Sequence, residues 1–254
     1  MPIPTFIHGI TGRMGSEISK ILAHQEISSL ALGGGWSTKN PIIGGFEFGL
    51  VNMTLILDFS LPDANQRLAN VLREQYAHLL SNGLAVLVGT TGLGHQGLSL
   101  WREVCDTFPG VRVLVAPNTS IGIYQLAKAS REIAQSLSHQ GFDIEITETH
   151  HRNKIDAPSG TARFLVEQIS KSVPQLHARY GNEGRRPSDS IGISVVRGGG
   201  VLGEHVVRFI SEEEELFIGH RAFSRGLFAS GAISLSKWLV MQGPGFYELE
   251  NVTL

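Results

Sequence analysis

Residues 148–162 combine proton-bearing side chains with the signals of a helix start. His150, His151 and Lys154 lie within five positions, and the turn-forming segment Asp156–Ser159 follows directly. Imidazole titrates near neutral pH, and a helix N-terminus binds anions through its backbone amides. We therefore expect this segment to bind a small dianion and to exchange a proton with it during a reaction.

The helix that follows this turn should begin with either Ser159 or Thr161 as its capping residue. The amides of Gly160 and Thr161 would then face outward and form an anion cradle, while Lys154 adds positive charge for a carboxylate or an imine. A strand ending before His150 would point the two adjacent histidines to different sides. Since the sequence also lacks an H-E-x-x-H pair, we expect no metal ion here.

A second candidate site lies near the N-terminus, where the sequence Gly-Ile-Thr-Gly-Arg-Met-Gly occupies positions 9–15. It follows a short apolar run and opens a helical pattern, which is the context of a dinucleotide-binding fingerprint. The spacing is G-x-x-G-x-x-G rather than the common G-x-G-x-x-G. The expected cofactor contacts in this turn are Gly9, Ile10, Thr11, Gly12, Arg13 and Met14.

The type of cofactor depends on the end of the second strand, where NAD-binding sites usually carry an acid for the ribose 2′-hydroxyl. No acid occurs between Glu26 and Glu47, whereas Ser37 and Lys39 could contact a 2′-phosphate. We therefore expect NADPH to be preferred, with NADH as the alternative. Two later loops at strand ends should complete the site through Gly89, Thr90, Thr91, Ala116, Pro117, Asn118 and Thr119.

The first half of the chain must position these loops, and its pattern alternates short apolar runs with helical periods. The expected strands are 5–8, 30–33, 54–59, 85–89 and 111–116, and the expected helices are 14–24, 63–80 and 98–107. Continuous apolar strands that alternate with helices predict a doubly wound parallel sheet, the α/β architecture called Rossmann-type.

The second half changes to an α+β pattern. Residues 142–148 alternate apolar and polar at period two, which predicts an open mixed or antiparallel sheet with one face free. The other expected strands are 191–197, 204–210 and 215–219, and the expected helices are 121–137, 161–172 and 227–241.

Composition restricts the function classes that this chain can belong to. Its net charge of −2 argues against nucleic acid or an anionic membrane as a partner. Its one cysteine, Cys105, forms no internal disulfide and suits a reducing compartment. No run approaches the length of a membrane span, so we expect a cytoplasmic protein.

Taken together, these residues resemble the dihydrodipicolinate reductase (4-hydroxy-tetrahydrodipicolinate reductase) family of diaminopimelate and lysine biosynthesis. The resemblance runs in order along nearly the whole chain. Its most specific motif is E-x-H-H-R-x-K-x-D-A-P-S-G-T-A at 148–162. The other matching segments are G-x-x-G-R-M-G at 9–15, Asp58-Phe59-Ser60, Gly89-Thr90-Thr91-Gly92, Ala116-Pro117-Asn118, Val196-Arg197-Gly198-Gly199, Gly203-Glu204-His205 and Ser230-Gly231-Ala232.

The resemblance implies a dinucleotide-binding domain of residues 1–120 and 230–254, and a substrate-binding domain of residues 121–229 that builds a homotetramer. It also implies an oxidoreductase in which NAD(P)H delivers hydride to a small cyclic dicarboxylate. By motif position, His150 looks like the proton donor or acceptor and Lys154 like a proton donor. His151, Gly160 and Thr161 look like carboxylate-binding residues.

Two other functions fit parts of the sequence. A related Rossmann-type reductase could act on another small imine or keto acid. A non-catalytic dinucleotide-sensing protein could keep the first domain, but such a protein should have lost His150, Lys154 or the Gly160-Thr161 cradle, and all are present.

Overall fold

The computed structural model describes residues 2–24, 29–37, 54–181 and 184–253. The chain divides into two compact units. The first unit consists of Met1–Ser120 and Gly226–Leu254, and the second consists of Ile121–Arg225. Neither unit's described part contains a helix that is long and apolar enough to cross a membrane.

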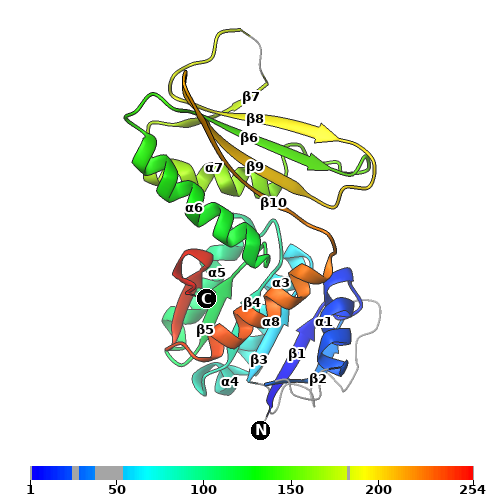
Figure 1. The fold of residues 1–254 in the computed structure, drawn as a ribbon. Helices are drawn as coiled ribbons and strands as arrows, with labels where there is room; N and C mark the ends of the chain where they lie inside the picture. The colour runs from blue at the N-terminus through cyan, green and yellow to red at the C-terminus, as the bar shows by residue number, and fades with distance from the viewer. Residues whose placement is uncertain (1, 25–28, 38–53, 182–183, 254) are drawn as a thin grey trace. The chain divides into compact units, whose positions relative to one another are not determined.

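The first unit is built on a six-stranded sheet in the order β11-β5-β4-β3-β1-β2 (Figure 1). Every neighbouring pair in this sheet is parallel. Its strands are β1 (Ile3–His8), β2 (Leu30–Trp36), β3 (Leu55–Asp58), β4 (Ala85–Val88), β5 (Arg112–Val115) and β11 (Gly245–Glu248).

Helices cover both faces of this sheet. Its helices are α1 (Arg13–His24), α3 (Pro62–Gln75), α4 (Ala77–Ser81), α5 (Gly94–Thr107) and α8 (Gly226–Val240), and a 3₁₀ turn follows at Leu249–Asn251. The pair α1 and α8 packs together on one face, and the pair α3 and α5 packs on the other (Figure 1).

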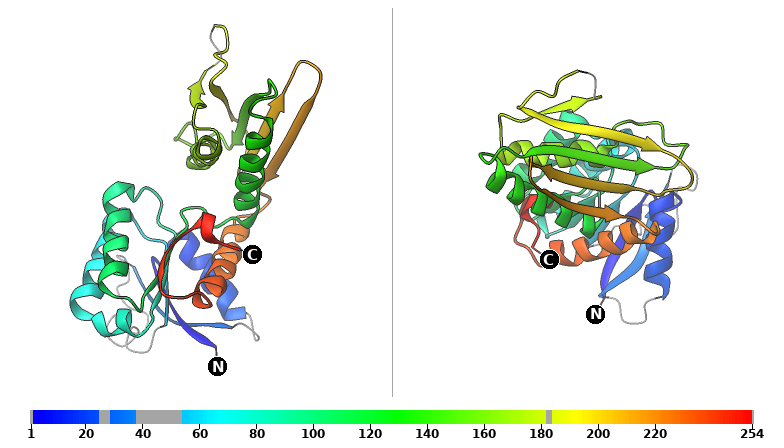
Figure 2. Two further views of the ribbon diagram at one scale, coloured as in Figure 1. Left: turned by 90° about the vertical axis from the view of Figure 1, so that its left-hand side faces the viewer. Right: turned by 45° about the horizontal axis from the view of Figure 1, so that its top comes forward.

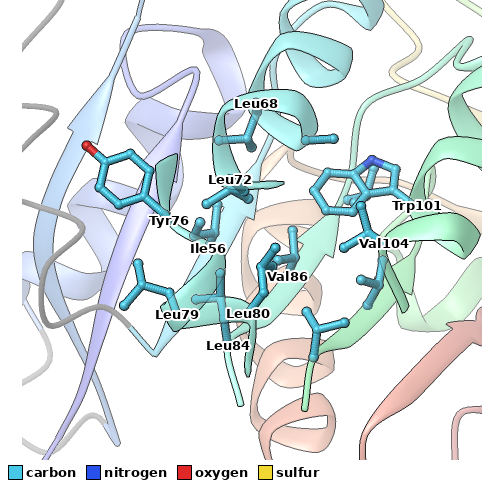
Figure 3. Packing of buried hydrophobic residues seen from close by; sticks show 14 of the residues in the cluster. Ile56, Leu68, Leu72, Tyr76, Leu79, Leu80, Leu84, Val86, Trp101 and Val104 are labelled. Carbon is cyan, nitrogen blue, oxygen red and sulfur yellow. The ribbon is translucent and has the colours of Figure 1, made fainter. Parts of the chain in front are cut away.

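Apolar side chains from both layers fill the core between α3, α5 and the sheet. Ile56 of β3 and Val86 of β4 are fully buried, as is Leu72 of α3, and Figure 3 shows them packed together. Trp101 of α5 is also fully buried, and its Nε1 donates to Oδ1 of Asn65 at 2.9 Å. Strands buried on both faces explain why these segments lack an apolar–polar alternation.

The second unit has a five-stranded mixed sheet in the order β10-β9-β6-β8-β7. Its elements are α6 (Ile121–Leu137), β6 (Asp143–His150), α7 (Gly160–Ser172), β7 (His177–Tyr180), β8 (Ser190–Arg197), β9 (Glu204–Ile210) and β10 (Glu215–Arg221). Both helices lie on one face of the sheet (Figure 2). Alternate residues of β6 and β9 are buried against them, as period two requires.

The expected fold class is confirmed: a parallel sheet covered on both faces, and an α+β unit with a mixed sheet. Some elements differ from the prediction. Strands β7 and β11 were not expected, because each is a four-residue edge strand with little apolar pattern. The helix expected at 63–80 is broken at Tyr76, which leaves helical geometry while its side chain is buried in the core.

Candidate active site

The strand order of the first unit reverses beside β1, since β2 lies on one side of it and β3 on the other. Ligands of open α/β sheets bind at such a switch point, outside the carboxyl ends of the strands. The glycine turn begins here at Gly9, directly after β1, and the Phe59-Ser60 segment follows β3.

The backbone at the glycine turn explains the residue at its first position. Gly9 has a φ of +86°, and a Cβ on it would lie 2.6 Å from the carbonyl oxygen of Phe59. The amides of Gly9 and Ile10 donate to the carbonyl oxygen of Trp36, at 2.7 and 3.2 Å. These bonds fix the turn against the end of β2.

A cavity of about 430 Å³ opens beside this turn. It is lined by His8, Gly9, Thr11, Gly12, Arg13, Trp36, Ser37, Phe59, Ser60, Leu61, Asp63, Ala64 and Arg67. Arg13 and Arg67 supply positive charge for phosphate groups, and Trp36 and Leu61 supply apolar surface for a ring. This combination fits the adenosine half of a dinucleotide.

The lining includes Gly9, Thr11, Gly12, Arg13 and Ser37 from the residues expected to contact the cofactor. Two further expected residues from the glycine turn are absent from it. Ile10 is buried, with 6% exposure, and Met14 is half-buried. Lys39 lies outside the described residues.

In the two later loops, some of the expected residues pack or bond within the protein and others are exposed to solvent. Gly89 is pressed against the ring of Phe59, and Thr90 donates to Asp58 and to the carbonyl oxygen of Ser60. Thr91 is exposed.

In the loop after β5, Ala116 is buried and Pro117 is exposed. The side-chain oxygen of Asn118 accepts from the Ser120 amide at 2.9 Å, while the Thr119 hydroxyl donates to the carbonyl oxygen of Phe228 at 2.7 Å. The side chain of Thr119 is therefore engaged with α8.

Asp58 forms hydrogen bonds with residues that line the cavity, and the sequence motif did not predict this role. It is fully buried and accepts from His8 Nδ1 at 2.6 Å, Ser60 at 2.6 Å, Asn65 at 2.7 Å and Thr90 at 2.5 Å. Burial opposes ionisation of this carboxyl, but the hydrogen bonds prevail and hold its pKa below the usual value. His8 stacks on Trp36, with ring centroids 4.6 Å apart.

The 148–162 segment of the second unit forms the end of β6, a turn and the start of α7. Its centre is Glu148, which is fully buried. Oε1 accepts from the Ser159 amide at 3.0 Å and from Nη2 of Arg197 at 2.9 Å. Oε2 lies 3.5 Å from Nδ1 of His150 and 3.6 Å from Nε2 of His205.

Ser159, rather than Thr161, caps α7, and its Oγ accepts from the Ala162 amide at 3.2 Å. The same hydroxyl lies 3.1 Å from Nε2 of His205. Gly160 and Thr161 are the first two residues of the helix, so their amides belong to its anion-attracting end. The structure thus brings His150 and the expected cradle to the same carboxylate, that of Glu148.

The remaining candidates lie closer to solvent. Nζ of Lys154 bonds both carboxylate oxygens of Asp156, at 2.7 and 2.9 Å, and its side chain is 21% exposed. His151, directly after β6, is half-buried. Lys154 is therefore paired with Asp156, and its side chain remains partly accessible to solvent.

Charges around His150 favour its neutral form. Burial and the nearby His205, together with Lys154 and Arg197, lower the pKa of His150 to about 4, against an opposing contribution from Glu148. Burial also disfavours the charged form of Glu148, but hydrogen bonds from His205, Ser159 and Arg197 hold its pKa far below the usual value. At neutral pH an ionised carboxylate thus faces a neutral His150.

The ligating atoms of Glu148, His150 and His205 all lie within 4.8 Å of one another, a spacing that would also suit a metal ion. However, Arg197 is bonded to the same carboxylate and its positive charge opposes a cation, while His205 is engaged with Ser159. Hydrogen bonds from Ser159 and Arg197 hold Glu148 and His205 in this arrangement.

Two family models together match nearly the whole chain. The model of the dihydrodipicolinate reductase N-terminus matches residues 3–119, and that of the C-terminus matches residues 122–253. A 4-hydroxy-tetrahydrodipicolinate reductase of Myxococcus xanthus is 32% identical, covering 98% of this chain and 97% of its own. One of Methanopyrus kandleri is 34% identical, covering 98% of this chain and 96% of its own.

A similar fold occurs among solved structures. The dipicolinate-bound dihydrodipicolinate reductase from Paenisporosarcina sp. TG-14 matches with a TM-score of 0.77 over 100% of both chains, at 24% sequence identity.

Proposed function

The chain belongs to the dihydrodipicolinate reductase family, and on this premise we propose how its residues carry out the reaction. The protein is an NAD(P)H-dependent 4-hydroxy-tetrahydrodipicolinate reductase, an oxidoreductase of diaminopimelate and lysine biosynthesis. In this reaction a hydride replaces the substrate hydroxyl, which takes up a proton and leaves as water, and the product is tetrahydrodipicolinate.

The first unit binds the cofactor in this proposal. Its support is the cavity beside the Gly9 turn, with Arg13 and Arg67 on its wall. When bound, the dinucleotide supplies the hydride. Ser37 lies where an NAD-binding protein usually has an acid, and it lines the same cavity, which favours NADPH over NADH.

The second unit binds the substrate dicarboxylate in this proposal. Gly160 and Thr161 hold one carboxylate through the start of α7, and His151 and Lys154 contribute side-chain contacts. The Lys154 ammonium donates a proton to the leaving hydroxyl. His150, neutral at neutral pH, accepts a proton from the substrate ring as water leaves and returns it to the ring once the hydride has been delivered. The single observation that carries this assignment is that one buried carboxylate, Glu148, faces His150 at 3.5 Å and accepts a hydrogen bond from the cap of α7.

The test couples purified dihydrodipicolinate synthase to this protein and follows oxidation of NADPH or NADH. We expect turnover with both cofactors and a higher kcat/KM with NADPH. Replacing His150 or Lys154 with Ala should lower kcat about a hundredfold, because proton transfer contributes that much or more, while the Kd for NADPH stays unchanged.

Glu167→Gln is the matched control, since Glu167 is exposed on α7 and pairs only with Lys171 among the described ion pairs. Absence of turnover would refute the activity. A large loss of NADPH affinity in the His150 or Lys154 variant would refute the division of roles between the units.

The proposal includes a homotetramer and a cytoplasmic location. Support for assembly comes from the sheet face opposite α6 and α7, where Phe217 is 62% exposed and Val196 is 46% exposed. Large apolar side chains exposed on a sheet face favour a protein–protein contact there. The single cysteine supports a reducing compartment.

A further inference from the structure

Two sequence segments that match the family have so far received no function: Val196–Gly199 and Gly203–His205. They lie at the end of β8 and at the start of β9, the two strands that flank β6. Strand register places His205 opposite Glu148 and Arg197 opposite His150. Three strands therefore bring these side chains together from positions about fifty residues apart in the sequence.

Glu148 joins both parts of the proposed substrate site. Its Oε1 holds the amide of Ser159, the residue that caps α7, and also holds Arg197. Its Oε2 faces Nδ1 of His150 at 3.5 Å. Arg197 adds a second tie to the turn, because its Nη2 also donates to the carbonyl oxygen of Asp156 at 2.6 Å.

We propose that Glu148, held by Arg197 and His205, is the positioning residue that sets the tautomer and orientation of His150 for proton transfer. This inference rests on the proton-transfer role given to His150 under the proposed function. Glu148 itself is buried and touches neither substrate nor cofactor in this proposal.

The tautomer follows from the properties of the facing atoms. An ionised carboxylate only accepts hydrogen bonds, and a neutral imidazole carries one N–H. Nδ1 faces the carboxylate and therefore carries the hydrogen, which leaves Nε2 as the proton acceptor. Gly203 lies beside that atom, and a Cβ there would come within 3.2 Å of Nε2, so glycine keeps that side of the ring uncrowded.

The distances indicate that Glu148 acts mainly during the reaction, when His150 carries a positive charge. At 3.5 Å the contact with Nδ1 is longer than a good hydrogen bond. Once His150 accepts a proton, the attraction between imidazolium and carboxylate grows and the contact can tighten. Glu148 would thus stabilise the charged imidazole, as a carboxylate does in a Ser-His-Asp triad.

His205 acts on His150 in the opposite direction. Its Nε2 lies 3.6 Å from the same oxygen of Glu148, and its ring is edge-on to that of His150, with centroids 5.1 Å apart. Positive charge on His205 opposes protonation of His150, as do Lys154 and Arg197, while the charge of Glu148 favours it. Replacing Glu148 with Gln and replacing His205 with Gln should therefore shift the pKa of His150 in opposite directions.

The first experiment compares wild type with Glu148→Gln, which keeps the shape of the side chain. Nitrogen chemical shifts of isotope-labelled histidine should show the Nδ1–H tautomer of His150 in wild type and its loss in the variant. We expect kcat to fall about a hundredfold, because a misplaced base forfeits most of the gain from proton transfer. The Kd for NADPH should not change, and Glu167→Gln should match wild type in every readout.

The second experiment records kcat/KM against pH for Glu148→Gln and His205→Gln. The acidic limb should move to lower pH in Glu148→Gln, since the carboxylate raises the pKa of His150, and to higher pH in His205→Gln. If Glu148 and His205 had only structural roles, both variants would have lower melting temperatures and the acidic limb of each would stay at its wild-type pH. If Glu148→Gln does not fold, the direction of the His205→Gln shift decides.

The outcomes separate this inference from the proposed function. If His150→Ala loses activity but Glu148→Gln retains both kcat and the Nδ1–H tautomer, the positioning role is wrong and the reductase assignment stands. If His150→Ala retains full activity, the proton-transfer role itself fails. If the acidic limb moves in the same direction in Glu148→Gln and His205→Gln, the positioning role is also wrong.

Discussion

At the scale of single residues, both candidate sites depend on a buried carboxylate. Asp58 accepts hydrogen bonds from His8, Ser60, Asn65 and Thr90, and Asp58→Asn would put a donor where one of its acceptor oxygens stood. We expect this change to lower the free energy of unfolding at neutral pH by about 3 kcal/mol, because one buried donor would face another donor and the remaining hydrogen bonds would lose their charged acceptor. Urea unfolding followed by circular dichroism measures the loss.

The effect of Asp58 should depend on pH with a definite sign. Its pKa is lower in the folded state, so its stabilisation is present above the unfolded pKa and is lost as pH falls through the folded pKa. The difference in stability between wild type and Asp58→Asn should therefore shrink in acid. The exposed Asp106→Asn is the control. A difference that stays constant with pH would contradict the assigned cause.

The local sequence pointed to the candidate proton-bearing residues but not to the residues that hold them in place. His150 and Lys154 stand in one dense motif, and Gly9 and Gly12 occupy positions at which backbone geometry demands small residues. Strand register brings Asp58 to His8, and it brings Arg197 and His205 to Glu148 and His150, and a single sequence does not display this register. Asp58 at a buried strand end was the one available signal, since a charge there requires partners.

At the scale of elements, the start of α7 combines a stabilising cap with a proposed anion site. Ser159→Ala removes the bond to the Ala162 amide, so we expect the free energy of unfolding to fall by about 1 kcal/mol. The first turn should then fray and raise KM for the substrate. Ser170→Ala is the control, because it loses one hydrogen bond near the other end of α7. Equal KM changes in both variants would refute the special role of the N-terminus.

Elements with a strong apolar pattern could be predicted, and short edge strands could not. Residues 55–58 and 85–88 are buried on both faces, so their continuous apolar runs reflect the parallel sheet directly. β7 and β11 each pair with a single neighbour, and their stability comes from that neighbour rather than from their own composition. The helix break at Tyr76 coincides with burial of its ring, a tertiary contact that the local sequence does not display.

At the scale of the whole molecule, the open sheet face of the second unit supports assembly. Phe217 on β10 is 62% exposed, and it lies opposite Arg208 on β9, whose guanidinium stands 5.6 Å from the centre of its ring. Phe217→Glu would place an acid on this face beside Glu215. Arg208 already pairs with Glu215, so the new carboxylate would lack a full partner of its own. Burying such a charge in an interface costs several kcal/mol, so we expect the proposed tetramer to dissociate.

Light scattering after size exclusion measures this change, with four copies expected for wild type and fewer for Phe217→Glu. Met241→Glu is the matched control, because Met241 is 81% exposed but lies in the first unit, after α8. Circular dichroism must show that the variant keeps its secondary structure, since β10 is an edge strand and tolerates an exposed acid. A tetramer that survives Phe217→Glu would exclude this sheet face as the interface, and dissociation by Met241→Glu instead would place the interface on the first unit.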